Sequence, residues 1–168
     1  MRVETPETGR VLSLDEAVAL VNRLRTRAAT IVFTNGVFDL LHPGHVRYLQ
    51  QARAEGDALI VGLNGDASVR RNKGPERPIN PEQERAEVLA ALASVDAVVL
   101  FDEDTPADII LAIQPDVLVK GADWPAGQIV GRDTVERRGG RVIRVEVETG
   151  YSTTSLVDRI RNAGRSTA

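Results

Sequence analysis

Apolar residues alternate between two spacings along this chain. Continuous apolar runs rich in Val, Ile and Leu are typical of buried strands, whereas apolar residues that recur every three or four positions indicate helices with one buried face. The runs predict strands at residues 30–34, 58–63, 95–101, 117–120 and 141–147. The helical spacing predicts helices at residues 14–24, 43–55, 82–92, 106–113, 128–138 and 153–162, with Ser13 and Ser152 as N-caps of the first and last.

Residues 66–81 interrupt this alternation. They are polar and basic and include three prolines and a glycine. Glycine and proline disfavour regular elements, so the composition predicts a mobile loop that carries Arg70, Arg71, Lys73 and Arg77.

Strands that alternate with helices favour a parallel sheet with helices on both faces, because each connection crosses over the sheet. We therefore predict a Rossmann-like, doubly wound α/β fold and one domain over residues 1–168. Residues 1–28 form an accessory segment and helix in this interpretation, and residues 163–168 a flexible tail. Ligands of such folds bind at the carboxyl ends of the strands, which places any site after residues 34, 63 and 119.

Composition narrows the function without deciding it. The 168 residues are 42% hydrophobic and 27% charged, with a formal net charge of -3 and no cysteine. This balance argues against a nucleic-acid or membrane surface, and the lack of cysteine excludes disulfides and thiolate chemistry. No signal peptide or membrane span is expected from the sequence, and we expect a cytoplasmic protein.

The candidate chemistry lies directly behind the first apolar strand. His42 and His45, the two histidines of the chain, flank Pro43 and Gly44 at the predicted entry to a helix. Proline suits the first turn of a helix, and glycine lets a ligand approach the backbone. Because a helix entry offers free N–H groups and the positive end of the dipole, the pattern favours an anionic ligand such as a triphosphate.

Three other interpretations compete for the histidine pair: solvated surface side chains, a zinc site and a structural pair. A zinc site lacks ligands, because there is no cysteine and no third histidine. The position of both histidines in one glycine-containing turn between strand and helix favours a functional role over the other two.

Residues 36–45, Gly-Val-Phe-Asp-Leu-Leu-His-Pro-Gly-His, resemble the HxGH signature of the cytidylyltransferase-like nucleotidyltransferase superfamily. Residues 150–155, Gly-Tyr-Ser-Thr-Thr-Ser, resemble its second nucleotide-binding signature. Further segments are similar to the heptose 1-phosphate adenylyltransferase branch, namely Lys73-Gly74, 77–81, 85–89 and 115–124. The resemblance extends from about residue 13 to 162 without the fused kinase domain familiar in this branch, so a stand-alone form is expected.

The resemblance implies transfer of AMP from ATP to D-glycero-β-D-manno-heptose 1-phosphate, with release of pyrophosphate and formation of an ADP-heptose for lipopolysaccharide or another glycoconjugate. It also implies Mg²⁺ with the nucleotide and a homodimer. Two alternatives remain open from the residues: a cytidylyltransferase acting on glycerol 3-phosphate or a similar acceptor, and a nucleotide-binding protein without turnover.

The resemblance and the residue chemistry together indicate three groups of site residues. His42, His45, Lys73 and Arg85 are expected to contact the triphosphate and stabilise the transition state. Asp39, Arg77, Asp123 and Trp124 are candidates for binding the acceptor, with Asp39 also a candidate ligand of Mg²⁺ held mainly by nucleotide phosphates. The other expected nucleotide contacts are Thr34, Asn35, Gly36, Phe38, Gly44, Lys120, Gly121, Tyr151, Ser152, Thr153 and Thr154.

Overall fold

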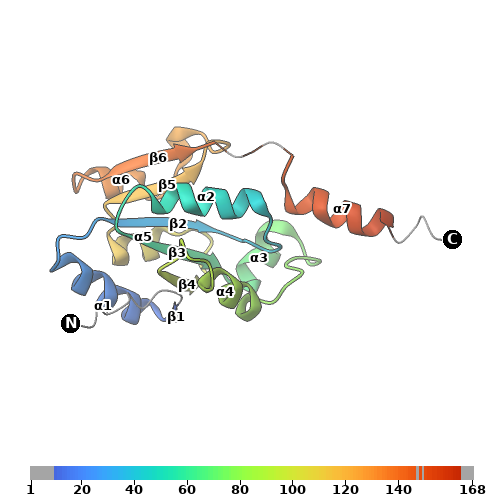
Figure 1. Cartoon of the computed structure of the whole chain (residues 1–168), viewed down its shortest axis with the longest axis horizontal. Helices are drawn as coiled ribbons and strands as arrows, with labels where there is room; N and C mark the ends of the chain where they lie inside the picture. Colours follow the sequence, from blue (N-terminus) through green and yellow to red (C-terminus); the bar gives the residue numbers. More distant parts are fainter. Residues whose placement is uncertain (1–9, 147, 149, 164–168) are drawn as a thin grey trace.

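The computed structural model describes residues 10–146, 148 and 150–163. It shows a six-stranded sheet in which every neighbouring pair is parallel, with helices on both faces (Figure 1). The prediction of a doubly wound α/β fold is confirmed. The strands are β1 (Arg10–Leu12), β2 (Ile31–Gly36), β3 (Ala58–Asn64), β4 (Ala97–Phe101), β5 (Val117–Gly121) and β6 (Arg141–Val145).

The helices connect these strands in nearly the predicted places. They are α1 (Leu14–Arg25), α2 (Pro43–Arg53), α3 (Asp66–Lys73), α4 (Glu82–Ala90), α5 (Ala107–Ile113), a 3₁₀ turn η1 (Ala126–Gln128), α6 (Arg132–Glu136) and α7 (Thr153–Ala163). The predicted cap of α1 is confirmed, because the Ser13 hydroxyl accepts from the Glu16 backbone and the Glu16 carboxylate accepts from Ser13 in return.

The strand order β1-β4-β3-β2-β5-β6 opens a crevice beside β2. From β2 the chain adds β3 and β4 on one side and then crosses to add β5 and β6 on the other. β2 pairs with β3 along its whole length, from Ile31 to Gly36, but pairs with β5 only at Val32 and Phe33. Beyond Phe33, β2 and β5 no longer pair with each other. The polar end of β2 therefore faces the crevice where folds of this kind bind ligands.

Alternating side chains of β2 enter two separate cores. Ile31 and Phe33 pack in one core, which includes residues of α1 and α5, and Val32 packs in the other, which includes residues of α2 and α4. This alternation is the period-two geometry of a strand buried on both faces. The two cores fix β2 from both sides, and they thereby hold the start of the histidine turn.

Two predicted elements differ from the structure. Residues 66–81 are not one loop, because residues 66–73 form the helix α3. The predicted helix 128–138 is a 3₁₀ turn followed by the short α6, because Gly131 between them has a φ of +87°. A Cβ on Gly131 would lie 2.6 Å from Cδ1 of Ile110, so this close approach also requires glycine.

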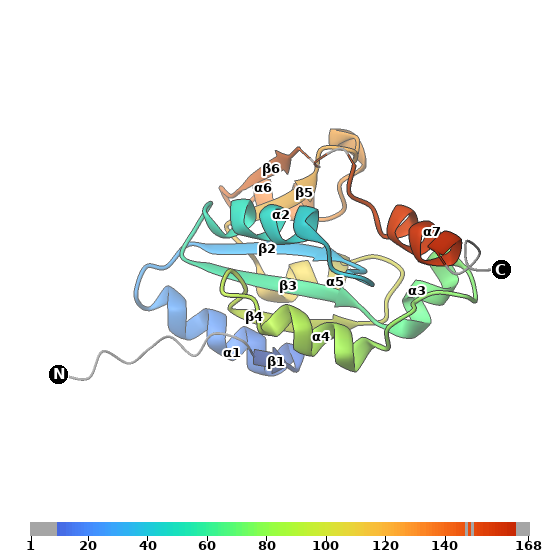
Figure 2. The same cartoon turned by 45° about the vertical axis from the view of Figure 1, so that its right-hand side comes forward.

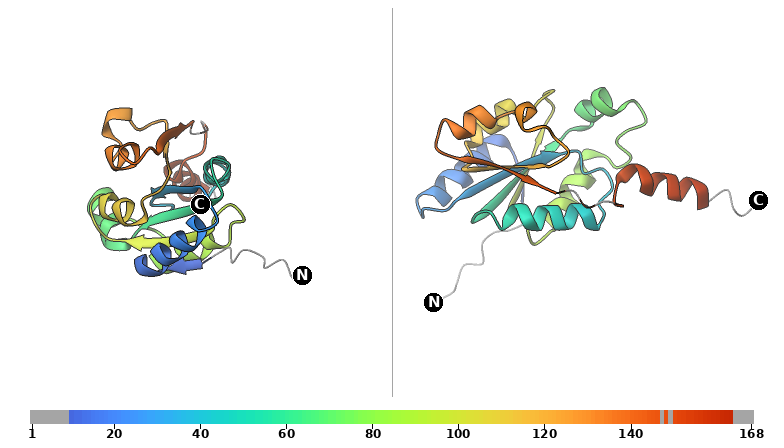
Figure 3. Two further views of the ribbon diagram at one scale, coloured as in Figure 1. Left: turned by 90° about the vertical axis from the view of Figure 1, so that its left-hand side faces the viewer. Right: turned by 90° about the horizontal axis from the view of Figure 1, so that it is seen from above.

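The helix α7 projects from the body of the molecule at the end where β2 and β3 terminate (Figures 1 and 2). The view from above in Figure 3 shows the same projection. None of residues 153–163 is buried. In the described ranges no helix has the length and apolar character needed to cross a bilayer.

The buried face of α5 gives a direct test of the core. Ile110 is fully buried and the adjacent Leu111 is 59% exposed. We expect Ile110→Ala to lower the free energy of unfolding by about 2–5 kcal/mol, because it removes buried methyl groups and leaves a cavity. Leu111→Ala, the matched control, should change it by less than about 0.5 kcal/mol in urea unfolding. Equal effects of the two substitutions would contradict the packing described here.

Candidate active site

The histidine turn begins where β2 ends. Gly36 lies under the ring of Phe38, since a Cβ at position 36 would be 2.9 Å from Cε2 of that ring. Phe38 itself has a left-handed φ of +44° and is buried. The chain then enters α2 with His42 as N-cap and Pro43 in the first turn, as the sequence predicts.

The two histidine rings stack on each other. Their centroids are 3.7 Å apart and their planes differ by 16°. Nδ1 of His42 accepts a hydrogen bond from the backbone N–H of His45 at 3.3 Å. An imidazole nitrogen that accepts carries no proton, so the neutral His42 ring has its proton on Nε2, where it can donate to a ligand.

Both histidines are poor bases in this environment. Burial, reinforced by the adjacent His42, lowers the pKa of His45 to about 4, although a backbone hydrogen bond with Leu40 opposes the shift. Burial also lowers the pKa of His42. The pair is therefore neutral near pH 7, and it offers hydrogen-bond donors and not fixed positive charges.

Two further rings extend the stack at its ends. Phe38 contacts His45 edge-on, with centroids 5.3 Å apart, and Tyr151 stacks on His42 at 5.9 Å. A Cβ on Gly44 would lie 3.0 Å from both Nδ1 of His42 and Cβ of Tyr151. The column thus joins the two sequence signatures, and a side chain at position 44 would be in tight contact with both.

Arg47 and Glu148 hold Tyr151 in this position. Arg47, on α2, forms an ion pair with Glu148 and lies 5.6 Å from the centroid of the Tyr151 ring. Ion pairing and hydrogen bonding to Glu148 raise the pKa of Arg47 above its ordinary value. Sequence reasoning missed both residues, because their contact joins α2 to a distant segment and neither belongs to a motif.

Tyr48 connects three elements at the floor of the crevice. Its hydroxyl lies 2.8 Å from the Thr34 hydroxyl on β2 and donates to the Val119 carbonyl on β5 at 3.3 Å. Burial raises the pKa of Tyr48 to about 12. Thr34 is thereby held inside the protein, whereas the neighbouring Asn35 has a buried Oδ1 with no partner among the described residues.

Asp39 anchors the segment that follows α3. Its carboxylate accepts from Nε of Arg77 at 2.7 Å and from the backbone N–H groups of Ile79 and Asn80 at 2.9 and 3.0 Å. Burial would raise the pKa of Asp39, but these hydrogen bonds outweigh it and lower the pKa. Because the side chain is 1% exposed and its oxygens are occupied, Asp39 does not fit the predicted role of metal or acceptor ligand.

Arg85 is a buried structural cation in this structure. Its side chain is fully buried, and its guanidinium donates to the carbonyls of Asn80 and Val37 at 3.0 and 2.7 Å and to Oδ1 of Asp66 at 2.8 Å. These partners come from the histidine turn, α3 and the segment before α4. A contact between Arg85 and a triphosphate, as predicted, would require these bonds to be exchanged.

Lys120, Asp123 and Trp124 gather at the carboxyl end of β5. Nζ of Lys120 lies 5.4 Å from the Trp124 ring, and burial lowers the pKa of Lys120 to about 8 although Asp123 opposes the shift. Trp124 is 49% exposed, so its ring is accessible to a ligand, as its predicted role in binding the acceptor requires. Gly121 ends the strand beneath this cluster.

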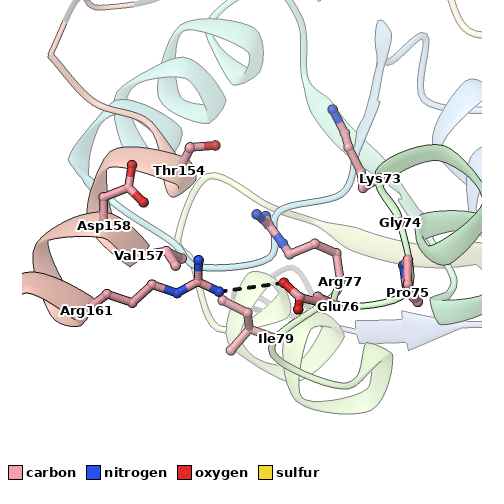
Figure 4. A pocket seen from close by; sticks show the side chains of 10 residues that line it. All are labelled: Lys73, Gly74, Pro75, Glu76, Arg77, Ile79, Thr154, Val157, Asp158 and Arg161. Carbon is pink, nitrogen blue, oxygen red and sulfur yellow. Dashed lines mark ion pairs between the residues drawn. The ribbon is translucent and has the colours of Figure 1, made fainter.

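The second signature begins α7 beside the histidine turn. Ser152 caps the helix by accepting from the N–H of Ser155 at 3.0 Å, as predicted, and the Thr153 hydroxyl donates to the Leu40 carbonyl at 3.4 Å. Thr154 faces a cleft whose opposite wall carries Lys73 and Arg77 (Figure 4). The structure therefore brings both signatures and the basic segment to one end of the sheet.

The described residues do not build a metal centre of their own. Within residues 10–146, 148 and 150–163, no three His, Asp or Glu side chains are grouped so that they could hold an ion. Asp39, the sequence candidate, is satisfied by protein donors. Any metal at this site would have to depend on ligand oxygens for most of its coordination.

Residues 33–161 match the family described as cytidylyltransferase-like. The chain belongs to this family. The match spans the histidine turn and the second signature, which are the two segments joined by the ring column.

This cytidylyltransferase-like chain matches longer proteins. It is 52% identical over 160 residues to the bifunctional protein HldE of Gluconobacter oxydans and 57% identical over 136 residues to that of Syntrophotalea carbinolica. These matches cover 95% and 81% of this chain but 33% and 28% of the relatives. The chain thus spans about a third of the length of the curated relatives it matches.

A solved structure supports the same family fold. The lipopolysaccharide core biosynthesis protein from Thermoplasma volcanium is 29% identical, with a TM-score of 0.60. The match covers 74% of this chain and 99% of that protein.

The buried His45 predicts a pH-dependent loss of stability. Its folded pKa of about 4 lies below the ordinary value of 6.5, so the unfolded state binds the proton first as the pH falls. The stabilisation that comes from keeping His45 neutral is complete above pH 6.5, and it is lost as the pH falls from 6.5 to about 4. His45→Gln should reduce the difference in unfolding free energy between pH 7.5 and 5 by about 2 kcal/mol, measured in urea. An unchanged difference would contradict the low pKa.

The bonds of Arg85 predict a structural effect of its removal. We expect Arg85→Gln to lower the free energy of unfolding by about 3 kcal/mol, because it leaves Asp66 and two carbonyls without their partner. Arg70→Gln, on the exposed face of α3, is the matched control and should change it by less than about 0.5 kcal/mol. If Arg85→Gln is as stable as the wild type in urea, the structural role of Arg85 is contradicted and the predicted contact with the triphosphate is favoured.

Proposed function

We propose that this protein transfers AMP from ATP to D-glycero-β-D-manno-heptose 1-phosphate and releases pyrophosphate. The observation that carries the proposal is the neutral His42–His45 stack at the end of β2, in a chain more than half identical to proteins named HldE. Because the chain matches about a third of those relatives, the proposal concerns the adenylyl transfer alone.

The proposed reaction needs position and hydrogen bonds more than a protein nucleophile. A phosphate oxygen of the acceptor attacks the α-phosphorus of ATP in line, and the bond from that phosphorus to the bridging oxygen of pyrophosphate breaks. Nε2–H of His42 donates to the phosphoryl oxygens as charge builds on them. A neutral donor suits this task, since it binds the transition state without holding the pyrophosphate product as tightly as a cation would.

The basic side chains around the stack complete the proposed site. Lys73 and Arg77 lie on the cleft beside α7, and Lys120 lies near the carboxyl end of β5. Lys120 has a pKa of about 8, so it is mostly protonated at neutral pH and suits a phosphate or ribose contact. Trp124 offers an exposed ring for stacking on a base or sugar.

Three finer features belong to the same proposal. Mg²⁺ would arrive with the nucleotide phosphates, because the described residues supply no metal centre. The resemblance also implies a homodimer, which light scattering tests, and a cytoplasmic location.

The decisive test is pyrophosphate release by the purified protein with D-glycero-β-D-manno-heptose 1-phosphate, Mg²⁺ and ATP, CTP, GTP or UTP in parallel. We expect release with ATP. His42→Ala should lower kcat about 10²–10³-fold, because the donor acts mainly in the transition state. Thermal unfolding of the variant at pH 7.5 is the control for intact folding. Release with CTP alone, or full activity of His42→Ala, would contradict the proposal.

A further inference from the structure

A cleft of about 440 Å³ lies between α7 and residues 73–79, and no step of the proposed chemistry uses most of its lining. Figure 4 shows the α7 side chains Asp158 and Arg161 facing Glu76 and Arg77 across it. The volume lies in the range that holds a small-molecule ligand. Neither Asp158 nor Arg161 belongs to the residues singled out by sequence.

Both walls of the cleft are tied to the histidine turn. Arg77 is bonded through Nε to Asp39, and Thr153 at the start of α7 donates to the carbonyl of Leu40. Asp39 and Leu40 lie three and two residues before His42 in the sequence. The cleft is therefore tied on both sides to the segment that leads into the histidine pair, and its Thr154 follows the residue that bonds Leu40.

Asp39 also orients Arg77 for binding an anion. The carboxylate is 1% exposed and holds Nε of Arg77 at 2.7 Å, so the two terminal nitrogens of the guanidinium remain for a ligand. Because the guanidinium of Arg77 is already held in place, the side chain loses less rotamer freedom on binding a phosphate than an unrestrained arginine would. Asp39 is then a positioning residue for Arg77 and does not itself touch the ligand.

The charges of the cleft distinguish between two anionic ligands. Lys73, Arg77 and Arg161 line it together with the carboxylates of Glu76 and Asp158. Arg161 lies 3.7 Å from Glu76. A polyphosphate tail offers anionic oxygens alone, so it has no donor for the carboxylate of Asp158. A sugar phosphate also offers hydroxyl groups, which Asp158 and the Thr154 hydroxyl can bind.

We propose that the cleft between α7 and residues 73–79 is the acceptor subsite, which binds a phosphorylated sugar through Lys73, Arg77 and Arg161 at its phosphate and Asp158 at its hydroxyls. The assignment rests on the proposed adenylyl transfer. It makes α7 a determinant of acceptor affinity, whereas the nucleotide depends on the histidine turn and the end of β5.

The test compares KM for heptose 1-phosphate and KM for ATP in Arg161→Gln and its matched control Arg159→Gln. Both arginines lie on exposed positions of α7, but Arg159 does not line the cleft. We expect Arg161→Gln to raise the KM of the acceptor roughly fivefold to tenfold, as for a partly exposed charged hydrogen bond, with the KM of ATP unchanged. Arg159→Gln should leave both values unchanged.

Glu76→Gln separates ligand binding from the loss of the Arg161–Glu76 pair. If Arg161 acts on the acceptor, this substitution frees it and lowers the KM of the acceptor. If the pair only braces the cleft, Glu76→Gln raises that KM as Arg161→Gln does, which overturns the assignment. A rise in the KM of ATP alone, or no change with Arg161→Gln, also overturns it. A wild-type protein that releases no pyrophosphate refutes the proposed function itself.

Discussion

The burial of two charged side chains, Asp39 and Arg85, determines the form of the crevice. A buried charge is tolerated only where hydrogen bonds replace its water, and each of these groups takes its partners from distant parts of the chain. Asp39 binds residues 77–80, and Arg85 binds the turn after β2, α3 and the backbone of Asn80. The two charges hold the basic segment beside the histidines before any ligand arrives.

The histidine pair works within the same constraint of burial. The two imidazole rings pack against each other and against Phe38 and Tyr151. Their charged forms are therefore disfavoured, and both side chains act as neutral groups. The positive charge of the site comes instead from basic residues that line the cleft and from the end of β5. The site therefore separates the groups that donate hydrogen bonds from the groups that carry charge, although both kinds face the same crevice.

Most elements were predictable from the sequence because each buries a continuous run or one periodic face. The helix α3 was missed because only Ser68 and Val69 of it are buried, so its polar, basic residues show no apolar stripe. The strand β1 is too short for a pattern. The histidine turn was recognisable from local sequence, whereas the bonds of Asp39 and Arg85 were not, since they depend on which distant segments the fold brings together.

The close approach of Gly44 to Tyr151 couples the backbones of the two signatures. A Cβ at position 44 would be in tight contact with both the His42 ring and Cβ of Tyr151 while the tyrosine is stacked on His42. Because the close atom is Cβ of Tyr151, which every residue except glycine has, a larger residue at position 44 requires the backbone at position 151 to move, whichever side chain stands there. The two motifs, distant along the chain, therefore constrain each other through the position of their backbones as well as through the ring stack.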